Sequence, residues 1–112
     1  MTGTKLGHRI AVYCPSADQQ GKRLNGVAQT VIDETHHLLC HLNGGSTEVK
    51  ARGTWQQGDG QVVVEDIVII YSHCRELTDD LLTSLTTHAQ WIKAAAHQAT
   101  VGIEIDQELL LV

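Results

Sequence analysis

Two carboxylates and a tyrosine in β-prone stretches are the first candidates for chemistry in this chain. Glu65 interrupts the apolar run 61–72, Tyr71 lies near the end of that run, and Glu104 lies in the alternating stretch 100–112. Because side chains at even spacing on a strand share a face, Glu65 and Tyr71 point the same way, and Glu104 can join them from a neighbouring strand. Paired carboxylates serve as general acid and general base. Glu65, Glu104 and Tyr71 therefore form a catalytic hypothesis.

The same charges also fit a structural role. Lys50 and Arg52, in the stretch 47–57, are expected on the same open face of the sheet as Glu65 and Glu104. Rows of opposite charge on neighbouring strands commonly fix strand pairing and subunit register. A binding module would pair Glu65 and Glu104 with these cations or with cations of a partner chain. An enzyme would leave at least one of the two carboxylates unpaired and facing a cavity.

A second group of candidates follows two predicted strands where each leads into a helix. Ser16, Lys22 and Arg23 follow the first strand, and His73 and Arg75 follow the third. If the two strands are parallel neighbours, these loops meet at one corner of the sheet. Backbone N–H groups at helix starts, together with three cations, would hold a small anionic ligand there, such as a phosphate or a carboxylate.

Cysteine and histidine are frequent, but their spacing does not complete a metal site. Adjacent strand residues point to opposite faces, so His73 and Cys74 do not chelate one ion together with Cys14. The stretch 35–42 offers two pairs at helical i, i+4 spacing, each with too few ligands for a closed site: His36 with Cys40, and His37 with His41. We therefore expect no metal and no cofactor, and three reduced thiols.

Hydrophobic periodicity predicts the elements that position these residues. Residues 78–99 are expected to form a helix with Thr78 as N-cap, His88 at the edge of its inward face and Ala99 inward. Asp59-Gly60 predicts a type I′ hairpin turn. The remaining elements are a strand at 9–14, a helix at 24–42 ended by Gly44-Gly45, strands at 47–57 and 61–72, and a closing strand at 100–112. A turn near Asp106-Gln107 is expected to fold residues 109–112 back as a short extra strand.

The order of these elements predicts an α+β fold of the ferredoxin-like βαββαβ type, an antiparallel sheet with two helices on one face. We expect the first and third strands to be parallel neighbours at its centre. Residues 1–112 form one domain in this prediction, with 1–8 flexible.

The uncovered side of such a sheet would be apolar. It receives either Ile67, Ile69 and Tyr71 or the intervening residues, beside Tyr13 and the aliphatic end of the chain. A large exposed apolar patch is unusual for a monomer, so we expect a homo-oligomer, a dimer or trimer, through this open sheet face. Alternatively, residues 109–112 fold over the face and cover it.

Composition excludes several classes of partner. The formal charge of −5 argues against nucleic acid as a partner. The sequence lacks an apolar run of the roughly 20 residues that a membrane span needs, and its first nine residues do not resemble a secretion signal. The expected location is the cytoplasm, without a membrane partner.

Three stretches together carry a family resemblance: AVYCPSADQQG, GGSTEVKARGTWQQGDGQVVVEDIVIIYS and VGIEIDQELLLV. They resemble short bacterial proteins of unknown function with a Gly-Gly helix end, a G-x-W strand, a D-G turn and a Glu-bearing apolar strand. The sequence departs from that pattern at residues 106–108, where Asn-Gly is expected. The resemblance implies a ferredoxin-like fold and no particular activity. At the level of fold only, the pattern is also similar to the trimeric PII-like proteins, which include ligand-sensing regulators and small enzymes that cleave sulfonium nucleosides at subunit boundaries.

Two functions remain open at this point. The first is a homo-oligomeric module that binds a small ligand or another protein. The alternative is a small lyase or hydrolase whose active site, at a subunit boundary, uses Glu65 and Glu104 near Tyr71.

Overall fold

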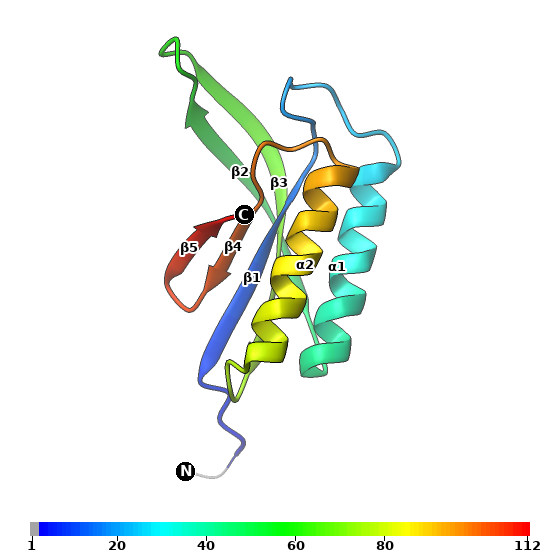
Figure 1. The fold of residues 1–112 in the computed structure, drawn as a ribbon, viewed down its shortest axis with the longest axis vertical. Coiled ribbons are helices and arrows are strands. Elements are labelled where there is room, and N and C mark those ends of the chain that lie inside the picture. Colours follow the sequence, from blue (N-terminus) through cyan, green and yellow to red (C-terminus); the bar gives the residue numbers. More distant parts are fainter. Residues whose placement is uncertain (1–2) are drawn as a thin grey trace.

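The computed structural model describes residues 3–112 as one five-stranded sheet and two helices. In the sheet the strands lie in the order β2-β3-β1-β4-β5, and every neighbouring pair is antiparallel. Both helices pack on the same side of the sheet, which confirms the α+β class (Figure 1). The elements are β1 (His8–Pro15), α1 (Val27–Asn43), β2 (Thr47–Gln56), β3 (Val62–Cys74), α2 (Asp79–Ala95), β4 (Gly102–Ile105) and β5 (Glu108–Leu111).

The core lies between the helices and one face of the sheet. Helical spacing brings the apolar positions of α1 and α2 onto the sides that meet the strands, and alternation does the same for β1 and β4. No helix among residues 3–112 is long and apolar enough to cross a membrane. The largest fully buried side chains are Ile10, Val12, Cys14, Val31, Thr35, Leu39, Ile70, Leu85, Ile92 and Ile103.

Local signals set the start of α2 and the end of α1 as predicted. The Thr78 hydroxyl accepts a hydrogen bond from the Leu81 backbone N–H at 3.2 Å, which satisfies one free donor of the first turn of α2. Gly44 ends α1 in the left-handed conformation, with φ of 84°. Helix α2 ends earlier than predicted, at Ala95, and Ala99 is exposed in the loop that follows.

The prediction that β1 and β3 run parallel is wrong. Arg9 lies opposite His73 and Pro15 lies opposite Ile67, so the two strands are antiparallel. The reason is topological. The crossover through α1 makes β1 and β2 run the same way, and β3, joined to β2 by a hairpin, enters between them in the opposite direction.

The two hairpins differ in how well they were predicted. The turn between β2 and β3 is not type I′, because only Gly60, and not Asp59, has a positive φ. Its Gly60 N–H donates to the Gln57 carbonyl at 2.9 Å, as in a three-residue connection with a left-handed last residue. At the other end, the chain does fold back at Asp106, which adopts a φ of 57°, so that β5 pairs with β4.

The open sheet face, the side away from the helices, is apolar as predicted. Register places Ile67, Ile69 and Tyr71 on it rather than Val68 and Ile70. The chain end does not cover it, because β5 extends the sheet at its edge and leaves Leu109 53% exposed and Leu111 67% exposed. Its main apolar side chains are Tyr13, Val49, Trp55, Ile67, Ile69, Tyr71, Leu109 and Leu111.

Lys50 and Arg52 do not lie on the open sheet face, which corrects the prediction that they share it with Glu65. Lys50 pairs with Val68 and Arg52 with Asp66, and these positions alternate with the open ones. Residues 1–2 lie outside the described part of the chain. Residues 3–7, which belong to the segment predicted to be flexible, precede β1 without forming a helix or strand.

His88 makes the stability of the fold sensitive to pH. Its Nε2 lies 2.8 Å from the Thr35 hydroxyl, which itself donates to the Val31 carbonyl, so His88 is the donor in its neutral form. Burial lowers the pKa of His88. The unfolded chain therefore takes up the proton first as pH falls, and protonation favours unfolding.

We expect the free energy of unfolding to fall as pH drops below about 6.5, the ordinary histidine pKa. Urea denaturation at neutral and mildly acidic pH would measure the loss. His88→Gln, which keeps an N–H donor without the titration, should lose less stability than the unmodified protein. His97→Gln, at an exposed position, is the control. An equal loss in His88→Gln would contradict this account.

Candidate functional site

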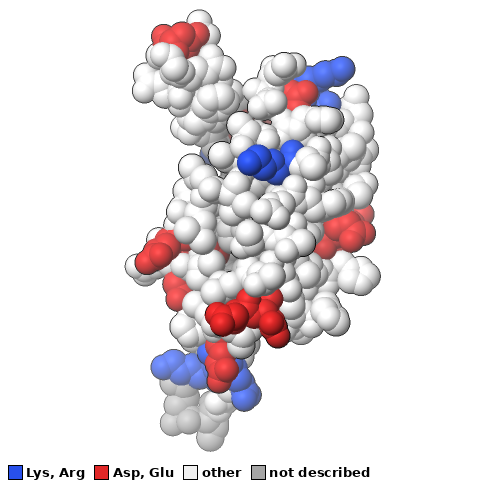
Figure 2. All heavy atoms as spheres, in the orientation of Figure 1, with Lys and Arg blue, Asp and Glu red and all other residues white. Residues whose placement is uncertain are grey.

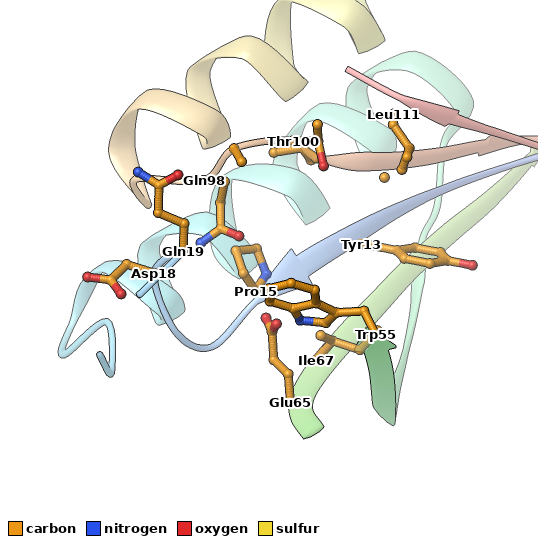
Figure 3. Close-up of a pocket in the computed structure, with 13 residues that line it drawn as sticks. Tyr13, Pro15, Asp18, Gln19, Trp55, Glu65, Ile67, Gln98, Thr100 and Leu111 are labelled. Atoms are coloured by element: carbon orange, nitrogen blue, oxygen red, sulfur yellow. The ribbon is translucent and has the colours of Figure 1, made fainter. Parts of the chain in front are cut away.

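A cavity of about 460 Å³ lies on the open sheet face, near the end of β1. Its floor consists of side chains from β1, β2 and β3, and its far wall is the loop between α2 and β4. Figure 3 shows Trp55 and Glu65 on one side of Pro15, with Thr100 and Leu111 across from them. The lining residues are Tyr13, Pro15, Asp18, Gln19, Trp55, Glu65, Ile67, Gln98, Ala99, Thr100, Val101, Gly102 and Leu111.

Two loops are joined to form the polar wall of this cavity. The Gln98 side chain donates to the Ala17 carbonyl at 2.6 Å, and the Gln19 N–H donates to the His97 carbonyl at 3.0 Å. The β1–α1 loop is itself braced by Asp18, whose carboxylate accepts from the backbone N–H groups of residues 20 and 22. The wall is therefore held in place by hydrogen bonds before any ligand arrives.

Strand register places Trp55 and Glu65 side by side in the cavity. Gly53 lies opposite Glu65 and Trp55 lies opposite Val63, so the indole and the carboxylate occupy diagonal positions of one face. The Trp55 side chain is still 46% exposed, which leaves an aromatic surface free for a ligand. A flat heteroaromatic ring fits such a wall, since aromatic rings prefer stacked or edge contacts.

Two titratable groups that line the cavity have a raised pKa, Tyr13 and Glu65, and the carboxylate of the two is Glu65. Burial raises its pKa, and a hydrogen bond from the Ser16 backbone opposes that rise. No ion pair with Lys or Arg neutralises Glu65 within residues 3–112. A half-buried, unpaired carboxylate in a mostly apolar cavity is suited to a cation or to a proton-transfer role.

Glu104 lies in a different part of the same face. It accepts a hydrogen bond from the Tyr13 hydroxyl, and this bond, followed by burial, raises the pKa of Tyr13. Tyr71 is engaged elsewhere, because the Arg9 guanidinium lies over its ring, 4.0 Å from the centroid. Glu104 and Tyr71 share a row across Ala11, whereas Glu65 lies six residues along β3, about 20 Å away. Glu65, Glu104 and Tyr71 therefore lie on the same face of the sheet, but within one chain Glu65 is not in contact with the other two.

The predicted anion corner is split between the two ends of the sheet. Ser16, Lys22 and Arg23 lie in the β1–α1 loop, near the cavity, whereas His73 and Arg75 lie where β3 ends. The separation follows directly from the antiparallel pairing of β1 with β3. The five residues therefore do not form one site.

The histidine-rich part of α1 makes polar contacts rather than a metal centre. His36 bridges the Ser46 hydroxyl at 2.6 Å and the Glu48 carboxylate at 2.9 Å, and Cys40 lies 3.4 Å from the same hydroxyl. Among residues 3–112 no group of three or more His, Cys, Asp or Glu side chains could hold a metal ion. Burial raises the pKa of the Cys14 thiol to about 11, so it is a neutral core group.

The distribution of charged residues on the helix side does not suggest a second candidate site there. Figure 2 shows Lys and Arg there in small separate groups, with acidic groups between them and at the tip of the β2–β3 hairpin. The described residues form no broad basic patch on that side.

The class that fold and site define is a small α+β domain with an aromatic, carboxylate-bearing cavity on its open sheet face. No family model matches the chain, and no curated protein matches it. Among solved structures, a phage SAM lyase in complex with S-methyl-5′-thioadenosine is similar, with a TM-score of 0.70 and 18% identity over 100% of this chain and 95% of that chain. A phage SAM lyase in the apo state is similar with a TM-score of 0.67 and 17% identity, over the same shares. At this level of identity the likeness shows the fold alone.

Proposed function

We propose that this protein is a small lyase that cleaves S-adenosylmethionine in the Trp55–Glu65 cavity. The observation that carries the proposal is Glu65, a half-buried carboxylate without a Lys or Arg partner among residues 3–112, beside an exposed indole. This meets the criterion that separates an enzyme from a binding module, an unpaired carboxylate facing a cavity. The fold shared with phage SAM lyase supports the choice of substrate.

The cavity suits a sulfonium nucleoside in three respects. Trp55 and Tyr13 offer aromatic surface to an adenine ring. The sulfonium cation is attracted both by the Glu65 carboxylate and by the face of the indole. The volume of about 460 Å³ lies within the range of small-ligand sites.

The chemistry needs little beyond binding and orientation. When the bond from sulfur to the γ-carbon of the methionine part breaks, its electron pair stays on sulfur, and S-methyl-5′-thioadenosine leaves as a neutral thioether. The four-carbon fragment is completed in one of two ways. Its own carboxylate closes a lactone at the γ-carbon, or its β-carbon loses a proton to Glu65 to form a double bond. The raised pKa of Glu65 suits the second route, and identification of the product distinguishes the two.

We place this site in a homo-oligomer, a dimer or trimer joined through the open sheet face. Support comes from the apolar residues on that face, including Val49, 47% exposed, and Leu109, 53% exposed. A second chain would also remove water from a cavity that is open in a single chain. With the order β2-β3-β1-β4, the four main strands fit the ferredoxin-like arrangement, which β5 extends. A cytoplasmic location suits the three free thiols.

Tryptophan fluorescence provides the direct test, because the chain has two tryptophans and only Trp55 lines the cavity. In Trp91→Phe, which keeps Trp55, we expect a fluorescence change on addition of S-methyl-5′-thioadenosine, since stacking alters the indole environment. In Trp55→Phe, which keeps Trp91, we expect no such change.

Turnover is measured in parallel as release of S-methyl-5′-thioadenosine from S-adenosylmethionine. Trp91→Phe should retain activity, and Trp55→Ala should lose about tenfold or more in ligand affinity, as expected for one stacked base. Binding without turnover would favour the non-enzymatic ligand-binding module. If the protein shows no binding and no turnover, the proposed function is wrong.

A further inference from the structure

A second cavity adjoins the first and shares part of its wall. It has a volume of about 700 Å³ and lies between the β1–α1 loop, the start of α1 and the β2–β3 hairpin. Four residues line both cavities: Asp18, Gln19, Trp55 and Glu65. The two hollows therefore adjoin at Trp55 and Glu65, and together they are called the groove.

The two parts of the groove differ in chemistry. The first part is mainly aromatic and aliphatic, from Tyr13, Ile67 and Leu111 among others. The second part is lined by charged and amide side chains: Asp18, Gln19, Gln20, Arg23, Asn25, Gln29, Gln57, Glu65 and Asp66. A ligand that occupies both parts must carry an apolar, flat end and a charged end.

Arg23 is the only basic residue that lines either cavity within the described chain. Its backbone position is fixed by a small hairpin, in which Ala17 pairs with Arg23 and the Leu24 N–H donates to the Ser16 carbonyl at 3.0 Å. The same hairpin carries Asp18. The backbone that carries this cation and this carboxylate is thereby held at a defined place along the second part of the groove.

We infer that the second part of the groove binds the amino-acid end of the substrate, with Arg23 recognising its carboxylate. This inference rests on the proposed function. S-adenosylmethionine carries a positive sulfonium, a positive ammonium and a negative carboxylate. With the sulfonium at Glu65, the ammonium faces the Asp18 side chain, and the carboxylate meets Arg23, whose guanidinium can donate two parallel hydrogen bonds.

This assignment makes Arg23 a specificity-determining residue. It distinguishes the zwitterionic substrate from a sulfonium that lacks the carboxylate, and from the thioether product, which lacks the amino-acid end altogether. Loss of the product is then easier than loss of the substrate, because the product contacts only the first part of the groove.

The test compares three ligands on Arg23→Gln and on the unmodified full chain by calorimetric titration. The ligands are S-adenosylmethionine, its decarboxylated analogue and S-methyl-5′-thioadenosine, with substrate affinities taken at a temperature where turnover is slow. We expect Arg23→Gln to weaken S-adenosylmethionine by about tenfold to a hundredfold, the loss of a hydrogen bond to a charged group, and to leave the other two ligands nearly unchanged.

Lys22→Gln is the matched control, because Lys22 is the adjacent cation but lines neither cavity. Equal affinity of Arg23→Gln and the unmodified protein for S-adenosylmethionine would overturn the inference and leave the proposed function standing. An equal loss for all three ligands would also overturn it, because Arg23 would then act on the loop rather than on the carboxylate. If the unmodified protein binds none of the three, the proposed function itself fails.

Discussion

We expect Glu65→Gln to weaken the proposed binding of S-adenosylmethionine by about tenfold to a hundredfold and to leave the binding of S-methyl-5′-thioadenosine nearly unchanged. Glutamine keeps the size and the hydrogen-bonding atoms of the side chain but removes its charge. S-adenosylmethionine carries a positive charge at sulfur, whereas S-methyl-5′-thioadenosine is neutral there. Only S-adenosylmethionine therefore loses an electrostatic partner. Turnover should fall with substrate affinity, and calorimetric titration with both ligands measures the difference.

The pH dependence of substrate binding should report the same group. Burial raises the pKa of Glu65, so its carboxylate takes up a proton at a higher pH than an exposed glutamate does. Affinity for the sulfonium should therefore decline as pH falls through that raised pKa, and Glu65→Gln should abolish the decline. Glu76→Gln, exposed in the loop before α2, is the control for charge alone. An equal loss of affinity for the neutral thioether in Glu65→Gln would show that Glu65 shapes the cavity rather than attracting the cation.

If the proposed oligomer forms through the open sheet face, we expect Leu109→Lys to convert it to single chains and to remove most of the proposed activity. Leu109 lies on the open sheet face opposite Glu104, and its side chain is 53% exposed in one chain. In a subunit interface a lysine there would have to leave water, and its one nearby carboxylate, Glu104, already accepts a hydrogen bond from Tyr13. The cost of desolvating the ammonium group can exceed the attraction of such a pair, so association is opposed. Sedimentation velocity over a dilution series measures the association state.

The neighbouring residue provides a matched control for this experiment. Leu110 is 46% exposed but lies opposite Ile103, on the other face of the same strand. Leu110→Lys should therefore leave the association state unchanged. If the unmodified protein already sediments as a single chain at high dilution, the open sheet face is not a subunit interface.

Local signals were the part of the fold that the sequence predicted well. The N-cap of α2 and the left-handed end of α1 depend on residues within one turn of each other, and both are found. The apolar character of the open sheet face was predicted because the run 61–72 is apolar at both sets of alternate positions, so that either register exposes apolar side chains. The direction of β1 relative to β3 depended instead on combining a crossover with a hairpin, and there the prediction failed.

The candidate site was predicted in part for the same physical reason. Glu65 was identified because a carboxylate in an apolar strand is conspicuous, and its place on the open sheet face follows from strand period. Trp55 was missed as a partner, because its position relative to Glu65 depends on the length of the turn between them. The wall formed by Gln98 and Ala17 joins residues 81 positions apart and has no local signal.

The bracing between the β1–α1 loop and the α2–β4 loop bears on how the groove opens. Since the bonds Gln98 to Ala17 and Gln19 to His97 hold both loops together, neither loop can swing away without the other. Opening of the two loops is then one cooperative motion, and a ligand that contacts both loops would suppress it. Binding and release of small molecules would then depend on the same opening motion, in which the two hydrogen bonds between the loops break.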